Sequence, residues 1–416
     1  MTIYHFIVGA SLILSSGSLA VAQGDDLNND GSENTKVKKR IFTSEVSGNF
    51  RGDYRFFPEE GLYAGQRQEY FSTVFNPEVY IDWNKGKQLI QFKGFGRLNQ
   101  YDTKQSHWDI RELYYLQVFK KWEYSVGVKQ IYWGFTESNH LTNVINQDDF
   151  LEGNDIDNKQ GQPMVHLSFT PKWGVVDIIG MTYFRDLKFP GVNGRGRPPF
   201  EINENGGYES DNEEYNLDLA IRWSHSIKSL DIGLSHFYGT SRTPFFIETN
   251  VVDSMPSTFA PFYELMNQSG LELQLTTGGM LWKLEAINRF SDRKTIRAFT
   301  VGGEYTFSNV FNADLGLLFE YNYDDRGEEI LNGLNDDIFV GMRIGFNDKQ
   351  STDFLGGANI DLEKGTALIF VEANRRLGDS WKATVKGVGF DNIKEEDFLY
   401  LIRKDGYIEL SLAKYF

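Results

Sequence analysis

The last residues of the chain constrain its fold more than any other segment. They read Asp405-Gly-Tyr-Ile-Glu-Leu-Ser-Leu-Ala-Lys-Tyr-Phe416, so that Ile408, Leu410 and Leu412 alternate with polar or small residues. Such alternation predicts a strand with one apolar face. An amphipathic strand that ends the chain on an aromatic residue is typical of an outer-membrane barrel, whose last strand pairs with its first and leaves no open sheet edge. We expect Phe416 to be recognised by the barrel-assembly machinery.

The other end of the chain has the features of an export signal. An apolar run over residues 6–14 precedes Ala20-Val21-Ala22, which fits a signal-peptidase site, although the first five residues contain no Lys or Arg. The run is too short to span a bilayer as a helix. We therefore predict a signal peptide over 1–22, a polar, disordered periplasmic tail over 23–40, and a barrel over 41–416.

Composition narrows the class of protein. The absence of Cys excludes disulfides, thiolate nucleophiles and thiolate metal sites. Hydrophobic content is 40%, aromatic content is 15% and mean hydropathy is −0.41, which argues against helical membrane spans and suits a barrel with aromatic girdles. The net charge of −16 disfavours nucleic acid as a partner and favours cations near the protein.

The spacing of alternating segments predicts an all-β, up-and-down antiparallel barrel that spans the membrane. Short connections alternate with mostly longer polar ones, near 58–66, 134–162, 185–212, 241–268, 324–334 and 392–404. The count is 18 strands, with 16 or 20 as alternatives. The predicted strands are 45–57, 68–83, 87–101, 109–119, 122–133, 163–171, 174–185, 213–225, 229–240, 269–277, 281–291, 295–307, 312–324, 335–347, 351–362, 366–376, 380–391 and 404–416.

Two segments resemble a known family. Lys129-Gln-Ile-Tyr-Trp-Gly134, followed by Asn143-Val-Ile-Asn-Gln-Asp-Asp-Phe150, is similar to a Lys/Arg-Gln-x-x-Trp-Gly strand end and a Val-Ile-Asn-Pro-x-Asp loop. These occur in a widespread, functionally obscure family of Gram-negative outer-membrane barrels, treated as porin-like or alginate-export-like channels. Here Gln147 stands in place of the family's Pro. The resemblance covers most of 70–180 and 335–416, and it implies the fold more strongly than the function.

If the apolar side chains face lipid, the alternate positions line the lumen. Their charges are mixed in sign and would sort solutes at a constriction, or else form a salt-bridged interior that stiffens the wall. The candidate pore-lining residues are Asp218, Arg222, Glu272, Lys283, Glu285, Arg289, Asp314, Glu320, Arg343 and Lys382.

Three loops carry candidate functional residues. The loop from Phe135 to Gln162 is expected to fold inward as a constriction; a calcium site or a solvated surface loop are the alternatives, and the spacing of its carboxylates is not that of a calcium-binding loop. Arg195 and Arg197 are expected to contact lipopolysaccharide phosphates or to cap the pore. The apolar segment from Met255 to Gln268 would serve as a lid, a plug or a docking patch. The loop carboxylates are Asp148, Asp149, Glu152, Asp155 and Asp157.

The sequence thus predicts a porin-like channel in the outer membrane of a Gram-negative bacterium, passing small solutes and needing no cofactor or metal. The alternatives are a plugged barrel for a specific apolar compound or polymer, and a barrel subunit of a surface-assembly or secretion complex. No catalytic residues stand out, so an enzyme is not expected. Expected partners are outer-membrane lipid, lipopolysaccharide, a small solute and, as one possibility, further copies of the chain.

Overall fold

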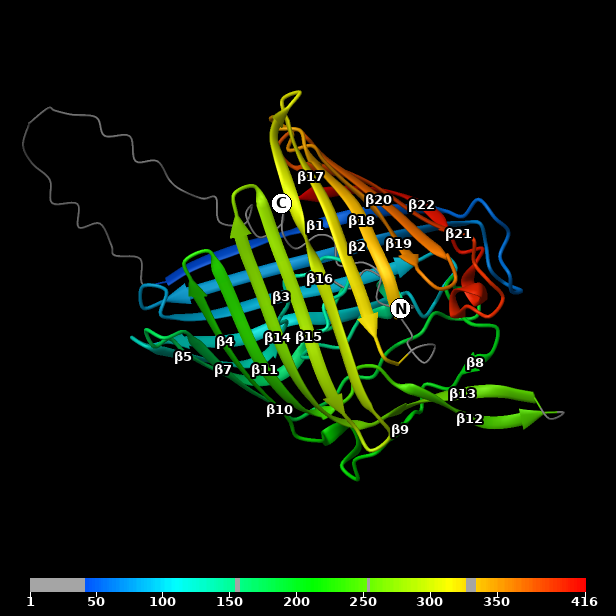
Figure 1. Cartoon of the computed structure of the whole chain (residues 1–416), viewed down its shortest axis with the longest axis horizontal. Helices are drawn as coiled ribbons and strands as arrows, with labels where there is room; N and C mark the ends of the chain where they lie inside the picture. The colour runs from blue at the N-terminus through cyan, green and yellow to red at the C-terminus, as the bar shows by residue number, and fades with distance from the viewer. Residues whose placement is uncertain (1–41, 154–157, 253–254, 327–333) are drawn as a thin grey trace, which may run out of the picture.

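The computed structural model describes residues 42–153, 158–252, 255–326 and 334–416. The predicted signal peptide and tail lie outside these residues, as do Asp155 and Asp157. The described residues form a closed barrel of 18 antiparallel strands (Figure 1), which confirms the predicted fold class and strand count. No helix among them is long and apolar enough to cross a membrane.

The strands follow one another around the barrel. The first nine are β1 (Phe42–Phe56), β2 (Glu69–Trp83), β3 (Gln88–Asn99), β4 (His107–Val118), β5 (Trp122–Lys129), β6 (Gln162–Phe169), β7 (Val175–Met181), β10 (Asp218–Ile227) and β11 (Leu230–Thr240). The others are β14 (Leu265–Thr277), β15 (Met280–Phe290), β16 (Thr295–Val310), β17 (Ala313–Asp324), β18 (Asp336–Gly345), β19 (Asp353–Asp361), β20 (Ala367–Leu377), β21 (Trp381–Asp391) and β22 (Tyr407–Tyr415). Short turns join them at one end and longer connections at the other, hereafter the short-turn end and the long-loop end.

The barrel closes where the sequence predicts. Strand β1 pairs with β2 on one side and with β22 on the other. Beyond the ladder, the backbone of Phe416 exchanges hydrogen bonds of 3.2 and 3.1 Å with Gly48. The ring of Phe416 lies 5.8 Å from that of Phe50 and 6.3 Å from that of Phe75, between centroids. A Cβ at residue 48 would lie 2.3 Å from the carbonyl oxygen of Asn76, so this close approach requires glycine.

The outer face of the wall is apolar. On β22, Ile408, Leu410 and Leu412 are 48%, 50% and 45% exposed, while the alternate residues Glu409 and Ala413 are buried and Ser411 is half-buried. The same alternation of exposed apolar residues with buried residues recurs on β10, β17 and β20. An apolar surface of this extent is unfavourable in water, whereas lipid accommodates it.

The long-loop end carries a small sheet that alternation within the barrel strands does not predict. Strands β12 (Phe245–Val252) and β13 (Met255–Tyr263) form a hairpin that projects beyond the wall in Figure 1. Two short strands, β8 (Glu201–Ile202) and β9 (Gly207–Tyr208), run parallel to β13. The apolar segment from Met255 to Gln268 therefore forms β13 and the first residues of β14.

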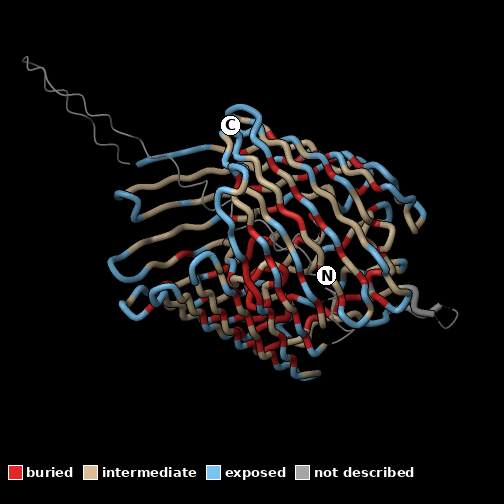
Figure 2. Tube along the Cα trace, turned by 45° about the horizontal axis from the view of Figure 1, so that its top comes forward, coloured by how far each residue is buried: buried red, intermediate tan, exposed pale blue. Residues whose placement is uncertain are grey.

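Burial is uneven along the barrel axis. In Figure 2 the buried residues gather in the part of the barrel nearer the long-loop end, while the hairpins that project at the short-turn end are half-buried or exposed. The cause is a segment of the chain that enters the lumen after β5, together with loops that fold over the long-loop end.

Candidate functional site

The lumen is partly filled by residues 130–153 and 158–161, hereafter the inward segment, which includes the short 3-10 turn η1 (Phe150–Glu152). The predicted fifth strand extends to residue 133, but β5 ends at Lys129. There the side chain of Asn146 replaces a neighbouring strand: its Oδ1 accepts a hydrogen bond of 2.9 Å from the N–H of Ile131, and its Nδ2 donates one of 2.8 Å to the carbonyl of Lys129. Because Asn146 satisfies these backbone groups, the chain can leave the wall.

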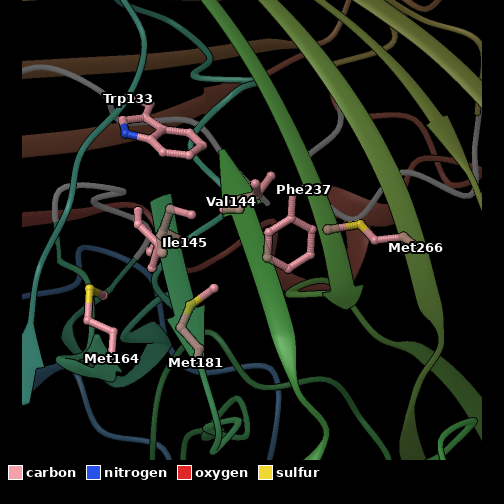
Figure 3. Close-up of a cluster of buried hydrophobic side chains, with 9 residues drawn as sticks. Trp133, Val144, Ile145, Met164, Met181, Phe237 and Met266 are labelled. Carbon is pink, nitrogen blue, oxygen red and sulfur yellow. The ribbon is translucent and has the colours of Figure 1, made fainter. Parts of the chain in front are cut away.

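Apolar side chains anchor the inward segment to one part of the wall. Val144 and Ile145 of the segment pack with Phe237 of β11 and Met181 of β7 (Figure 3). Ile145 is fully buried, and the cluster includes further residues from β6, β10 and β14. Burial of this kind stabilises by about 25 cal/mol per Å² of apolar surface, so the cluster holds the segment against β6, β7, β10, β11 and β14.

A buried carboxylate on β15 binds the first turn of the segment. The Oε1 atom of Glu285 accepts hydrogen bonds from the backbone N–H groups of Phe135 (2.8 Å) and Thr136 (3.0 Å) and from Thr136 Oγ1 (2.6 Å). Its Oε2 atom accepts from the N–H and Oγ1 of Thr142, both at 3.1 Å. Hydrogen bonds to a carboxylate are about twice as strong as neutral ones, so Glu285 is a major anchor.

Neighbouring strands bind the following residues. Glu320 of β17 accepts the N–H groups of Glu137 and Ser138, both at 2.7 Å, and the Ser138 hydroxyl at 2.6 Å. Glu137 in turn pairs with Lys283 of β15 at 2.7 Å and with Arg343 of β18 at 3.1 Å. Four of the predicted pore-lining residues, Lys283, Glu285, Glu320 and Arg343, thus hold the inward segment rather than face open space.

The far end of the segment is bound to β3 and β4. Arg97 donates two hydrogen bonds, of 2.7 and 2.6 Å, to Glu152, and Arg111 pairs with Asp149. Burial alone would raise the pKa of Asp149, but the hydrogen bond with His107 and the charge of Arg111 outweigh burial and lower the pKa to about 2. The predicted loop carboxylates Asp149 and Glu152 are therefore anchors.

A β-bulge makes the contact of Arg111 possible. Lys93 of β3 pairs with Glu112, and the next residue, Gly94, pairs with Ile110, so Arg111 has no counterpart on β3. A bulge of this kind breaks the alternation of side chains. As a result both Arg111 and Glu112 point into the barrel, where they bind Asp149 and Lys93 respectively.

The remaining predicted pore-lining residues, except Lys382, have partners on the wall or at the short-turn end. Arg222 pairs with Glu272 at 2.5 Å, and Arg289 donates to Gln268 at 2.8 Å. Asp218 pairs with Arg242 at 2.8 Å, close to where Arg242 binds the inward segment. Asp314 accepts from the N–H of Asn309 at the short-turn end, and Asp148 pairs with Lys159 within the segment. Lys382 alone of the ten pore-lining candidates lines the cavity described next.

A cavity of about 410 Å³ remains in the lumen on the side away from the apolar cluster. Seven of its lining side chains are cationic and three are carboxylates. The cations are Arg51, Arg55, Arg97, Arg111, Lys159, Lys382 and Lys386, and the carboxylates are Glu152, Glu372 and Glu409. They come mainly from β1, β3, β4, β20, β21, β22 and the inward segment.

The pairing of these charges leaves the cavity surface cationic. All three lining carboxylates are paired: Glu152 with Arg97, Glu409 with Arg55, and Glu372 with Lys386. The partners of Arg51, Arg111 and Lys159 are Asp53, Asp109, Asp149 and Asp148, none of which lines the cavity. Within the described residues, the side chain of Lys382 makes no ion pair or hydrogen bond.

The loop that follows β7 covers part of the lumen at the long-loop end. A smaller cavity of about 90 Å³ shares Arg55, Tyr407 and Glu409 with the first, so the two adjoin. Its roof contains Arg195, which pairs with Asp405 at 2.7 Å and stacks 4.2 Å from the ring centroid of Phe57. Of the two roles that the sequence left open for Arg195, this position fits a cap over the lumen.

The cations of the first strands were not among the predicted pore-lining residues. Arg51 and Arg55 alternate on β1 with the exposed Phe50 and Tyr54, which is the same signal that singled out residues of the later strands. Arg97 of β3 fits the same alternation, whereas the bulge in β4 breaks the alternation at Arg111. Within the described residues no group of three or more His, Asp or Glu is placed to hold a metal ion.

Comparison with known proteins gives no family. No protein-family model matches the chain, and no curated protein matches it, so the family resemblance stays a prediction. Similar solved structures include a loop-deletion mutant of OmpT, an outer-membrane protein of Vibrio cholerae, with 11% identity and a TM-score of 0.45 over 90% of this chain and 100% of that one. A triple mutant of the Rhodopseudomonas blastica porin gives 11% and 0.41 over the same shares. Likeness at this level supports no conclusion about solute or mechanism.

Proposed function

We propose that this chain is a porin-like channel of the Gram-negative outer membrane that lets small solutes diffuse through its lumen and prefers small anions. The observation that carries the proposal is the cavity of about 410 Å³ beside the inward segment, with its excess of cationic side chains. A closed barrel with an apolar exterior and a polar, hollow interior is the architecture of an outer-membrane channel.

The preference for anions follows from which charges meet the solute. An anion in the cavity contacts guanidinium and ammonium groups directly, and the Lys382 side chain forms no ion pair in the described structure, where the nearby Glu372 is paired with Lys386. Walls of low dielectric concentrate the field of such a lining on the passing ion. The preference is opposite to the one expected from the net charge of −16, because most acidic side chains lie outside this cavity.

The test is conductance of the purified, refolded chain in planar bilayers. Under a tenfold KCl gradient across the membrane, the reversal potential should have the sign of the chloride equilibrium potential. A cation-selective channel would overturn the anion preference while keeping the channel, and a lack of conductance at every voltage would overturn the channel itself. The same measurement with the chloride salts of larger cations and the potassium salts of larger organic acids would give the size of the largest ion that passes through the lumen.

A further inference from the structure

The barrel wall is incomplete between β4 and the chain that follows β7. Strand β4 has 12 residues, whereas β5, β6 and β7 have 8, 8 and 7. The ladder between β4 and β5 begins at Leu113 and Val128, so in the described structure no strand pairs with His107–Glu112 on that side. The ladder between β6 and β7 reaches only Val165 and Gly180. A gap therefore opens in the wall at the long-loop end.

A cavity of about 350 Å³ occupies this gap. On its outer side lie Trp108 and Tyr183, which are 77% and 40% exposed. On its inner side lie Asp149, Leu151 and Gln160 of the inward segment, none more than 7% exposed. The cavity thus reaches from the outer surface of the barrel to the segment that fills the lumen.

A single layer of side chains separates this lateral cavity from the luminal one. Arg111 lines the luminal cavity, and Asp149, with which it pairs, lines the lateral cavity. Along the inward segment, Glu152 and Lys159 face the lumen and Gln160 faces the gap, while Leu151 lies between the gap and the smaller luminal cavity. The lateral and luminal cavities therefore lie on opposite sides of this layer.

Side-chain contacts close the gap where the strand ladder is missing. Asp109 of β4 pairs with Arg185, which follows β7, at 2.7 Å, and with Arg111 at 2.9 Å. Arg185 also donates a hydrogen bond of 2.7 Å to the carbonyl of Gly161. The Arg185 side chain is 26% exposed. A partly exposed ion pair contributes only about 0–1 kcal/mol, much less than a continuous strand ladder, so this seam is held less strongly than the paired strands beside it.

We propose that the gap is a lateral entrance, through which an amphiphile with an apolar chain and an ionic head group passes from the outer leaflet toward the lumen. Trp108 and Tyr183 offer rings at the outer opening, where amphipathic aromatic side chains suit the membrane interface. Arg185 and Asp149 offer charged partners for a head group farther in. In the present structure the ion pair of Asp109 and Arg185 holds the entrance closed. The entrance adds a route to the proposed channel and does not depend on its ion selectivity.

Photo-cross-linking in phosphatidylcholine vesicles tests the entrance without requiring conductance. The probe is a fatty acid with a diazirine on its alkyl chain, and labelled residues are identified by mass spectrometry. We expect label on Gln160, which lines the lateral cavity but neither of the two luminal cavities, so that the amphiphile reaches it through the gap. Label confined to lipid-facing residues such as Leu113 would overturn the proposal.

Variants give a second, independent measure. Arg185→Ala removes the closing ion pair and should increase labelling of Gln160 several-fold. The matched control is Arg375→Ala, which removes the ion pair of Arg375 and Asp348 at a distant turn and should leave the labelling unchanged. Equal labelling in both variants would overturn the role of the closing pair. Conductance of the same preparations is recorded separately, so a silent channel and a sealed gap give different results.

Discussion

The carboxylate of Glu285 accepts a hydrogen bond of 3.0 Å from the backbone N–H of Thr136, which lies 149 positions earlier in the chain. This contact joins a strand of the wall to the segment that occupies the lumen. The space left free in the lumen is therefore set by buried polar contacts between distant parts of the chain, and these contacts can be changed one at a time.

Glu285→Ala should loosen the inward segment. The substitution leaves the N–H groups of Thr136 and Thr142 without their acceptor, and each buried donor without a partner costs about 1–3 kcal/mol. We expect larger and noisier single-channel currents, together with a lower midpoint of urea unfolding in vesicles. The control is Glu272→Ala: Glu272 is equally buried but pairs with Arg222 on the wall. It should lower stability without enlarging the current, and equal currents in the two variants would contradict the anchoring role.

Lys382→Glu should weaken or reverse the preference for anions. In water, one unit charge at contact distance contributes about 1 kcal/mol, and the substitution changes the local charge by two units. We expect the ratio of chloride to potassium permeability to fall several-fold, as measured by the reversal potential. Lys349→Glu makes the same charge change at an exposed turn outside the cavity and should have a much smaller effect. A shift of similar size in both variants would mean that the cavity is not the selective region.

Acid should release the far end of the inward segment. The Asp149 carboxyl has a pKa of about 2, below its usual value of 3.8, because His107 and Arg111 outweigh the effect of burial. A depressed carboxyl pKa stabilises the folded state fully above the unfolded value and loses this contribution as the pH falls through the folded value. We therefore expect anchoring to weaken between about pH 4 and pH 2, seen as a change in single-channel current.

Asp149→Asn is the companion to this pH experiment. It removes the charge that Arg111 and His107 bind, so the current should resemble the acid state already at neutral pH. The part of the acid response that comes from Asp149 should then be missing. An unchanged acid response in Asp149→Asn would assign it to other carboxylates.

Phe416→Ala should weaken closure of the barrel. The Phe416 ring contacts Phe50 and Phe75 across the junction of β22, β1 and β2. Aromatic pairs contribute about 0.5–1.5 kcal/mol beyond the area they bury, so we expect a loss on the order of 1–2 kcal/mol in urea unfolding and slower folding into vesicles. Phe311→Ala removes a ring that is 99% exposed at a turn, and it should stay within about 0.5 kcal/mol of the parent. Equal losses in the two variants would contradict a special role of the terminal ring.

Local sequence determined the barrel itself. Side chains of a strand alternate between its two faces, so the spacing of residues such as Ile408, Leu410 and Leu412 is enough to show which face meets lipid. Counting such segments gave the strand number, and the aromatic end of the last one indicated closure against the first. The alternation depends on neighbours within a few residues, and closure follows from the requirement that a sheet in a membrane have no open edge. Both can therefore be inferred from the sequence alone.

Tertiary structure decided what the inward charges do. Glu285 and Lys382 occupy equivalent positions in the alternating pattern, yet one binds the inward segment and the other faces open space. The strand pattern cannot separate them, because the path of the inward segment (residues 130–153 and 158–161) depends on contacts with β7, β11, β15 and β17 that form only when the barrel closes. The same holds for the bulge at Arg111, which alternation cannot foresee, and for the early end of β5, where Asn146 takes the place of a strand. Periodicity is a local property, whereas free space in a lumen depends on which distant segment fills it.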